Sequence, residues 1–214
     1  LSGELERCGP AVADVSVDRF EVDGNNFGSA GGALDFTDEF DNGTLAPWTP
    51  LLGTAVEAGG VVTLKSPGTV ILGLDVSNIE LDADVDNGAG NFTASTYWLP
   101  AVPAPDTEFH FQLYTLGAVI ESAGMNFNNL TVAPPPTLTG PSISCGLTQI
   151  DGGGFHNLSS AAVPVDPLAI TGHIVFRLNF DDATDMMTCS YSLNDGATFQ
   201  SFGIAMSLEG LNNA

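Results

Sequence analysis

Short runs that alternate apolar and polar residues, each followed by a turn-forming cluster, dominate this sequence from Leu34 to its end. Alternation with a two-residue period is typical of β-strands with one buried face, and clusters of Gly, Pro, Asn and Asp indicate tight turns. No window of the sequence shows a sustained helical period with capping residues. The pattern predicts an all-β chain of two packed antiparallel sheets, a β-sandwich. The expected strands lie at 61–65, 69–75, 79–86, 92–99, 108–116, 128–132, 142–150, 173–180, 186–193 and 198–204.

The first 33 residues have a different character. Residues 1–10 have the composition of an exposed lead-in, and residues 13–24 alternate like a strand whose phase shifts at Arg19. Such a shift indicates a β-bulge or two short strands. A glycine-rich connector follows at 24–32. We therefore expect an N-terminal arm with its connector over residues 1–33 and one β-sandwich domain over residues 34–214.

The charge balance excludes several classes of function. The chain has 26 acidic and 4 basic residues, a formal net charge of −22. So few cations cannot neutralise a run of phosphates, which argues against nucleic-acid binding, and an anionic membrane surface repels the chain. No apolar run is long enough for a membrane helix, so direct membrane insertion is not expected. A solvated acidic coat and a specific calcium requirement remain alternative explanations of the charge.

Location and cysteine pairing are linked expectations. The chain starts at Leu1 instead of Met, which is typical of a mature secreted protein whose signal peptide has been removed, or of an expressed fragment. Cys145 and Cys189 both lie in strand-like runs and can join two strands by a disulfide, leaving Cys8 over. Pairing of Cys8 with either of the others, and an intermolecular bridge, remain alternatives. We expect a secreted, extracellular or cell-surface protein.

Two segments resemble the concanavalin A-like lectin/glucanase superfamily. Residues 35–68, "DFTDEFDNGTLAPWTPLLGTAVEAGGVVTLKSPG", are similar to the opening of such domains, with an acid-Phe pair, a glycine turn, Trp48 and a hydrophobic strand. Residues 173–203, "HIVFRLNFDDATDMMTCSYSLNDGATFQSFG", are similar to their late hairpin. The resemblance covers about residues 34–210. It implies a jelly roll of two curved sheets whose concave face often carries sugar sites.

Laminarinase-type glycoside hydrolases of the same superfamily offer a sharper comparison. Their start, their aromatic-Trp-Leu strand and their catalytic strand are matched in order by residues 38–42, 79–100 and 107–117. The expected catalytic strand of the form Glu-x-Asp-x-(x)-Glu reads Glu108, His110, Gln112 here, so only the first acid is present. With Tyr114, these residues form one polar face of a strand whose other face carries Phe109, Phe111 and Leu113. Acid, imidazole, amide and phenol groups can hydrogen-bond sugar hydroxyls.

The stretch "IELDADVDNGAG" at residues 79–90 places four acids at two-residue spacing. It nearly spells the hydrolase motif with Glu80, Asp82 and Asp84, but one strand too early. Its acids also match the first positions of a calcium loop, although that loop needs a glycine at the sixth position, where Asn87 stands. The preferred interpretation is a strand with one buried and one acidic face. A cation at Asp86 and Asn87, and another at Asp181, Asp182 and Asp185, are the calcium hypotheses.

These observations favour a non-catalytic module over an enzyme, because the polar strand lacks the second carboxyl that glycoside hydrolysis needs. The preferred function is carbohydrate binding or cell-surface recognition by Glu108, His110, Gln112 and Tyr114. The first alternative is a structural subunit of an extracellular layer or filament, whose N-terminal arm adds as a strand to a neighbouring copy. The second alternative is a glycoside hydrolase or lyase with a divergent site. The expected partners are a glycan or further copies of the chain.

Overall fold

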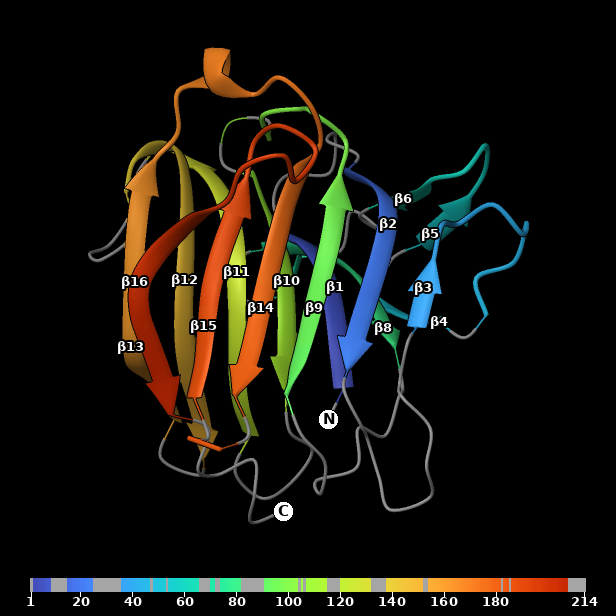
Figure 1. The fold of residues 1–214 in the computed structure, drawn as a ribbon. Coiled ribbons are helices and arrows are strands. Elements are labelled where there is room, and N and C mark those ends of the chain that lie inside the picture. Colours follow the sequence, from blue (N-terminus) through green and yellow to red (C-terminus); the bar gives the residue numbers. More distant parts are fainter. Residues whose placement is uncertain are drawn as a thin grey trace.

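The alternating segments form two antiparallel sheets that pack face to face in the computed structural model (Figure 1). The β-sandwich predicted from the sequence is thereby confirmed. The structure describes residues 2–8, 15–24, 36–46, 48–52, 54–65, 70–71, 74–81, 91–103, 105, 107–114, 120–131, 138–151, 154–181, 183–184 and 186–207.

Each sheet has eight strands within this described part, and consecutive strands are often spatial neighbours. Sheet A comprises, in spatial order, β13 (Gly154–Pro164), β12 (Gly140–Asp151), β11 (Ile120–Leu130), β10 (Thr107–Tyr114), β1 (Ser2–Cys8), β8 (Leu74–Leu81) and β4 (Trp48–Leu52), with β7 (Val70–Ile71) paired to β8. Sheet B comprises β16 (Gln200–Ser207), β15 (Met186–Ser192), β14 (Ile174–Asp181), β9 (Phe92–Trp98), β2 (Val15–Gly24), β6 (Val62–Lys65) and β5 (Thr54–Glu57), with β3 (Phe36–Asp38) paired to β2.

Helix is minor, as the sequence predicts. A single 3-10 turn, Pro167–Ala169, interrupts the strands of the described part, with Asp166 as its N-cap. No helix within the described ranges is long and apolar enough to cross a membrane.

The N-terminal segment differs most from expectation. β1 lies between β10 and β8, and β2 lies between β9 and β6, so neither strand projects from the sheets in this structure. The register of β2 against β9 shifts between Val17 and Arg19, which confirms the bulge indicated by the phase slip at Arg19. The expected domain boundary near residue 33 stays a prediction.

Aromatic side chains from the two inner faces interdigitate to fill the core. Trp98 of β9 is fully buried, and its ring centroid lies 4.4 Å from that of Phe109 on β10. Phe20 of β2 meets Phe111 edge-on across the same interface at 5.8 Å. Edge-to-face and offset contacts of this kind add to the stabilisation that burial provides.

A disulfide also joins the two sheets. Cys145 of β12 and Cys189 of β15, both buried, are bonded with their Cα atoms 6.3 Å apart. The pairing predicted from their places in strand-like runs is confirmed. Cys8 lies in β1, and its side chain is outside the described part.

The segment that carries the resemblance around residues 38–48 is held by a buried carboxylate. Asp38 accepts hydrogen bonds from the backbone N–H of Phe40 at 2.9 Å and from Nε1 of Trp48 at 2.7 Å. Phe40 has φ = 49°, in the left-handed region that disfavours side chains with a Cβ. Both aromatic rings are buried in the core.

Candidate functional site

Three polar side chains of β10 form a hydrogen-bonded row on the face of sheet A that points away from sheet B. They alternate with Phe109 and Phe111, which are buried in the core. His110 Nε2 lies 3.1 Å from Glu108 Oε2, and Gln112 Nε2 lies 3.1 Å from His110 Nδ1. The side chains of His110 and Glu108 are 13% and 21% exposed, so the row is partly shielded and still accessible.

Ser122 of the neighbouring strand β11 extends the row. Its hydroxyl donates to Gln112 Oε1 at 2.9 Å. One set of proton positions satisfies all three contacts: the Gln112 amide donates to His110 Nδ1, and His110 Nε2–H donates to Glu108. The row therefore fixes the direction of each donor and acceptor before any ligand arrives.

Gly124 makes room for this row. It pairs in register with Gln112, and a Cβ built at Gly124 would lie 2.6 Å from Gln112 Cγ and 2.7 Å from the carbonyl oxygen of Phe111. The second contact is with backbone, which cannot yield by a rotamer change. Any side chain at Gly124 would therefore displace Gln112, and the glycine is a structural requirement of the row.

Asn126, which is partly exposed, continues the polar surface along β11, whereas Asn128 on the same strand is buried. They pair with His110 and Glu108 on one side and with Ser144 and Ser142 of β12 on the other. Asn128 is almost fully buried; its amide donates to Ser144 Oγ at 3.2 Å, while its Oδ1 has no hydrogen-bond partner. The partly exposed side chains of Asn126 on β11 and Ser144 on β12 therefore lie beside the row.

The strand on the other side of β10 contributes acidic positions that the sequence interpretation missed. The register sets Glu4 of β1 opposite Gln112 and Glu6 opposite His110, and it pairs Glu80 of β8 with Glu4. Paired positions share one face of a sheet. Residues 2–8 of the expected lead-in therefore form strand β1, which is established by its pairing with β10 and β8.

Of the four sugar-binding residues predicted on β10, the structure brings Glu108, His110 and Gln112 into contact. Tyr114 lies at the end of the same strand, and its side chain is outside the described part.

The calcium hypotheses stay predictions. Asp86, Asn87, Asp182 and Asp185 lie outside the described residues, as does the whole of the acidic stretch 82–90. Asp181 is described, and its carboxylate accepts hydrogen bonds from Ala183 N at 3.1 Å and Thr184 Oγ1 at 2.9 Å. Among the described residues, no group of three His, Cys, Asp or Glu side chains could hold a metal ion.

A histidine and an aspartate anchor the hairpin between β15 and β16. Asp195, in a left-handed conformation next to Gly196, accepts from both the backbone N–H and Nδ1 of His173, each at 2.6 Å. Gly172 allows this approach, because a Cβ there would overlap the carboxylate. The backbone hydrogen bond from His173, and to a smaller extent the side-chain one, lower the pKa of Asp195 from its ordinary value of 3.8.

The contact between Asp195 and His173 predicts an acid-side titration. A lowered pKa means that the hydrogen bonds are fully present above pH 3.8 and are lost as the pH falls through the lower folded value. We expect the amide proton of His173, followed by NMR, to move with a midpoint below 3.8. A midpoint at or above that value would contradict the contact, and Asp195→Asn should abolish the transition.

Comparison with protein-family models, with curated proteins and with solved structures found no match. The fold and the site together define a class of protein: an all-β antiparallel sandwich with a preorganised polar row on one outer face.

Proposed function

We propose that this protein is a secreted, non-catalytic β-sandwich module of the concanavalin A-like kind that binds carbohydrate on the outer face of sheet A. The observation that carries the proposal is the row of Glu108, His110 and Gln112, fixed by Ser122. Calcium is proposed as an accessory ion, to be tested by chelation.

The chemistry of the row suits sugar hydroxyls, each of which is both a donor and an acceptor. Glu108 and Gln112 make no other hydrogen bond in the described part, so one carboxylate oxygen and one amide N–H are free to pair with a ligand. Side chains already held in place lose little rotamer freedom on binding. The partly exposed Asn126 of β11 and Ser144 of β12 extend the same polar surface, so that a ligand of more than one sugar unit could be bound.

Catalysis is the less supported function, because Glu108 is the one carboxylate in the row. Retaining and inverting glycosidases both need two carboxyl groups on either side of the scissile bond. Glu4, Glu6 and Glu80 occupy paired positions on the same face and could supply a second carboxyl group. A hydrolase or lyase therefore remains one outcome of the test. Cleavage of the bound oligosaccharide that Glu108→Gln removes would reassign the protein to that class.

The binding test uses a glycan microarray that includes laminarin, followed by calorimetry with the oligosaccharide that binds best. We expect Glu108→Ala and His110→Ala each to weaken binding by about ten-fold or more, since each removes a fixed polar partner. Tyr114→Ala tests the fourth residue. Ser201→Ala, exposed on β16 of the opposite sheet, is the control and should bind like the wild type. Unchanged affinity in both row variants would refute the assignment of the site.

Assembly into a layer or filament is proposed as the alternative. Its support is that β1 is hydrogen-bonded along both edges, by β10 and β8, so residues 2–8 of another copy would fit the same place in the sheet. Mass photometry with calcium and then with chelator separates the two functions. Assembly would be favoured by particles larger than a monomer that disappear when residues 1–24 are deleted. A monomer both with calcium and with chelator would refute assembly under those conditions.

A further inference from the structure

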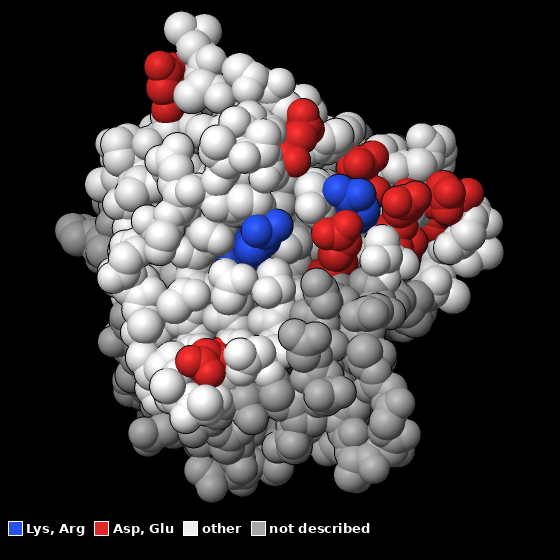
Figure 2. Space-filling view, viewed as in Figure 1, with Lys and Arg blue, Asp and Glu red and all other residues white. Residues whose placement is uncertain are grey.

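The outer face of sheet B holds an arginine that forms no ion pair with any carboxylate of the described residues. Figure 2 shows acidic side chains gathered on the side of β2 to β5, while the surface over β14 to β16 is largely uncharged around one basic group. On β14, the guanidinium carbon of Arg177 lies 3.6 Å from the ring centroid of Phe199, and its Nε donates to Ser95 at 3.4 Å. Among the described residues Arg177 has no ion pair, in a chain of net charge −22.

Arg19 provides an internal comparison on the same face. Its guanidinium carbon lies 3.9 Å from the ring centroid of Tyr97, and its Nε lies 3.2 Å from Glu21. Both arginines are therefore stacked on an aromatic ring, but only Arg19 is paired with an acid. The stack and the Nε contact hold the planar group of Arg177, which is partly exposed, and its terminal N–H groups make no hydrogen bond within the described part. Such a group suits a carboxylate or sulfate ligand.

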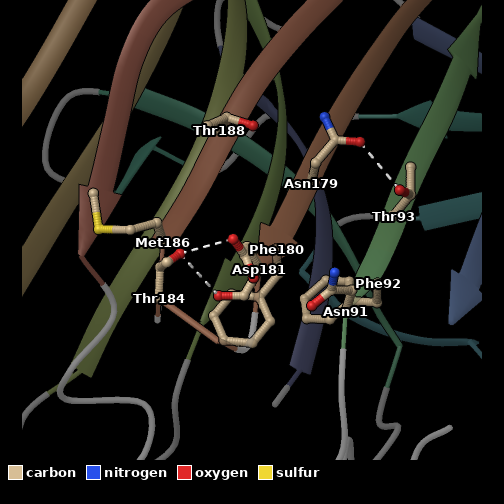
Figure 3. A pocket seen from close by; sticks show the side chains of 9 residues that line it. All are labelled: Asn91, Phe92, Thr93, Asn179, Phe180, Asp181, Thr184, Met186 and Thr188. Atoms are coloured by element: carbon tan, nitrogen blue, oxygen red, sulfur yellow. Dashed lines mark hydrogen bonds between the residues drawn. The ribbon is translucent and has the colours of Figure 1, made fainter. Parts of the chain in front are cut away.

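A pocket opens on the same face one step along β14. Its volume is about 380 Å³, and it is lined by Asn91, Phe92, Thr93, Asn179, Phe180, Asp181, Thr184, Met186 and Thr188 (Figure 3). Phe92 and Phe180 stack with centroids 5.2 Å apart and supply an apolar wall. Arg177 and Asn179 are alternate residues of one strand, so they share a face at a separation of about 6.6 Å.

The polar groups of the pocket are arranged for a hydroxylated ligand. Thr93 Oγ1 donates to Asn179 Oδ1 at 3.1 Å, which fixes the amide so that Nδ2 is its remaining donor. Thr188 lies on the neighbouring strand β15, opposite Asn179 in register. Amide and hydroxyl groups beside stacked aromatic rings match the mixed surface of a sugar ring, whose faces are apolar and whose edge is polar.

We propose that this face of sheet B is a second binding site, for an acidic saccharide whose anionic group is held by Arg177 while a neighbouring ring enters the pocket. The site is separate from the row on sheet A and does not depend on it. Salt screens the attraction by Arg177 beyond about 8 Å at physiological ionic strength, and the net charge of −22 opposes the approach of an anion. The contact therefore selects a ligand that carries its charge at the right distance from the pocket.

The test measures binding of trigalacturonic acid by calorimetry at physiological ionic strength, with galactotriose as the uncharged counterpart and a sulfated trisaccharide to distinguish the two anions. We expect Arg177→Gln to weaken binding of trigalacturonic acid by about ten-fold or more and to leave galactotriose unchanged. Arg19→Gln is the matched control: it makes the same change in net charge on the same face, yet it should leave both ligands unaffected.

Further variants keep the outcome decisive. Asn179→Ala should weaken the charged and the neutral ligand alike, because it removes a pocket donor and no charge. Arg177→Lys keeps the charge if Arg177→Gln does not fold, and should bind trigalacturonic acid with intermediate affinity. The proposal is overturned if the wild type binds neither anionic trisaccharide, or if Arg177→Gln and Arg19→Gln weaken binding equally.

Discussion

Replacing both Cys145 and Cys189 by alanine is expected to lower the free energy of unfolding by about 4 kcal/mol. The two residues are 44 positions apart, so their bond closes a long loop and removes much conformational freedom from the unfolded chain. The bond also fastens β12 of one sheet to β15 of the other. Urea unfolding followed by tryptophan fluorescence, with the linear extrapolation to water, measures the change.

Reduction of the wild type separates the cross-link from packing. Both sulfur atoms are buried, so the double variant loses side-chain volume as well as the bond. Wild-type protein that is unfolded by urea in the presence of dithiothreitol keeps both side chains and loses only the disulfide. We expect this reduction to produce most of the loss of stability seen in the double variant. If oxidised and reduced protein unfold at the same urea concentration, the disulfide does not stabilise the sandwich.

Asp38→Ala is expected to cost about 4 kcal/mol, because two buried donors each lose a charged acceptor at about 2 kcal/mol apiece. The donors are Phe40 N and Trp48 Nε1, and both aromatic rings belong to the core. Loss of the carboxylate also removes the hydrogen bond that holds Phe40 in its left-handed conformation. Urea unfolding again provides the measurement.

Two further variants make this result specific. Glu39 is the adjacent acid and is exposed, so Glu39→Ala changes the charge equally and should stay within about 0.5 kcal/mol of the wild type. Asp38→Asn retains one acceptor oxygen and should fall between the two. Equal stability of Asp38→Ala and Glu39→Ala would show that the buried carboxylate does not organise this segment.

The strands with strict alternation could be predicted from sequence, and those without it could not. β9, β12, β14 and β15 were expected within a few residues, because apolar side chains recur at every second position. β13 was missed since "GFHNLSSAAVP" has little apolar alternation and follows a glycine cluster. β1 was missed for the same reason: with two glutamates and an arginine in seven residues, its place between β10 and β8 depends on partners distant in sequence.

In the candidate site, too, some residues could be predicted from sequence alternation and others depend on strand pairing. Periodicity was sufficient to place Glu108, His110 and Gln112 on one face of a strand. It could not supply Ser122 or Gly124, because their role depends on the register of β11 against β10. Nor could it distinguish Arg177, which has no acidic partner among the described residues, from Arg19, which pairs with Glu21 two strands away.

The most direct test of the central claim is NMR chemical-shift mapping with the oligosaccharide that binds best on the glycan microarray. If the row on β10 is the sugar site, the amides that shift will cluster at residues 108–112 on β10 and 122–128 on β11. His110→Ala would remove those shifts while leaving the rest of the spectrum in place. Shifts confined to other strands, or no shifts with any glycan, would contradict the assignment of sheet A as the carbohydrate-binding face.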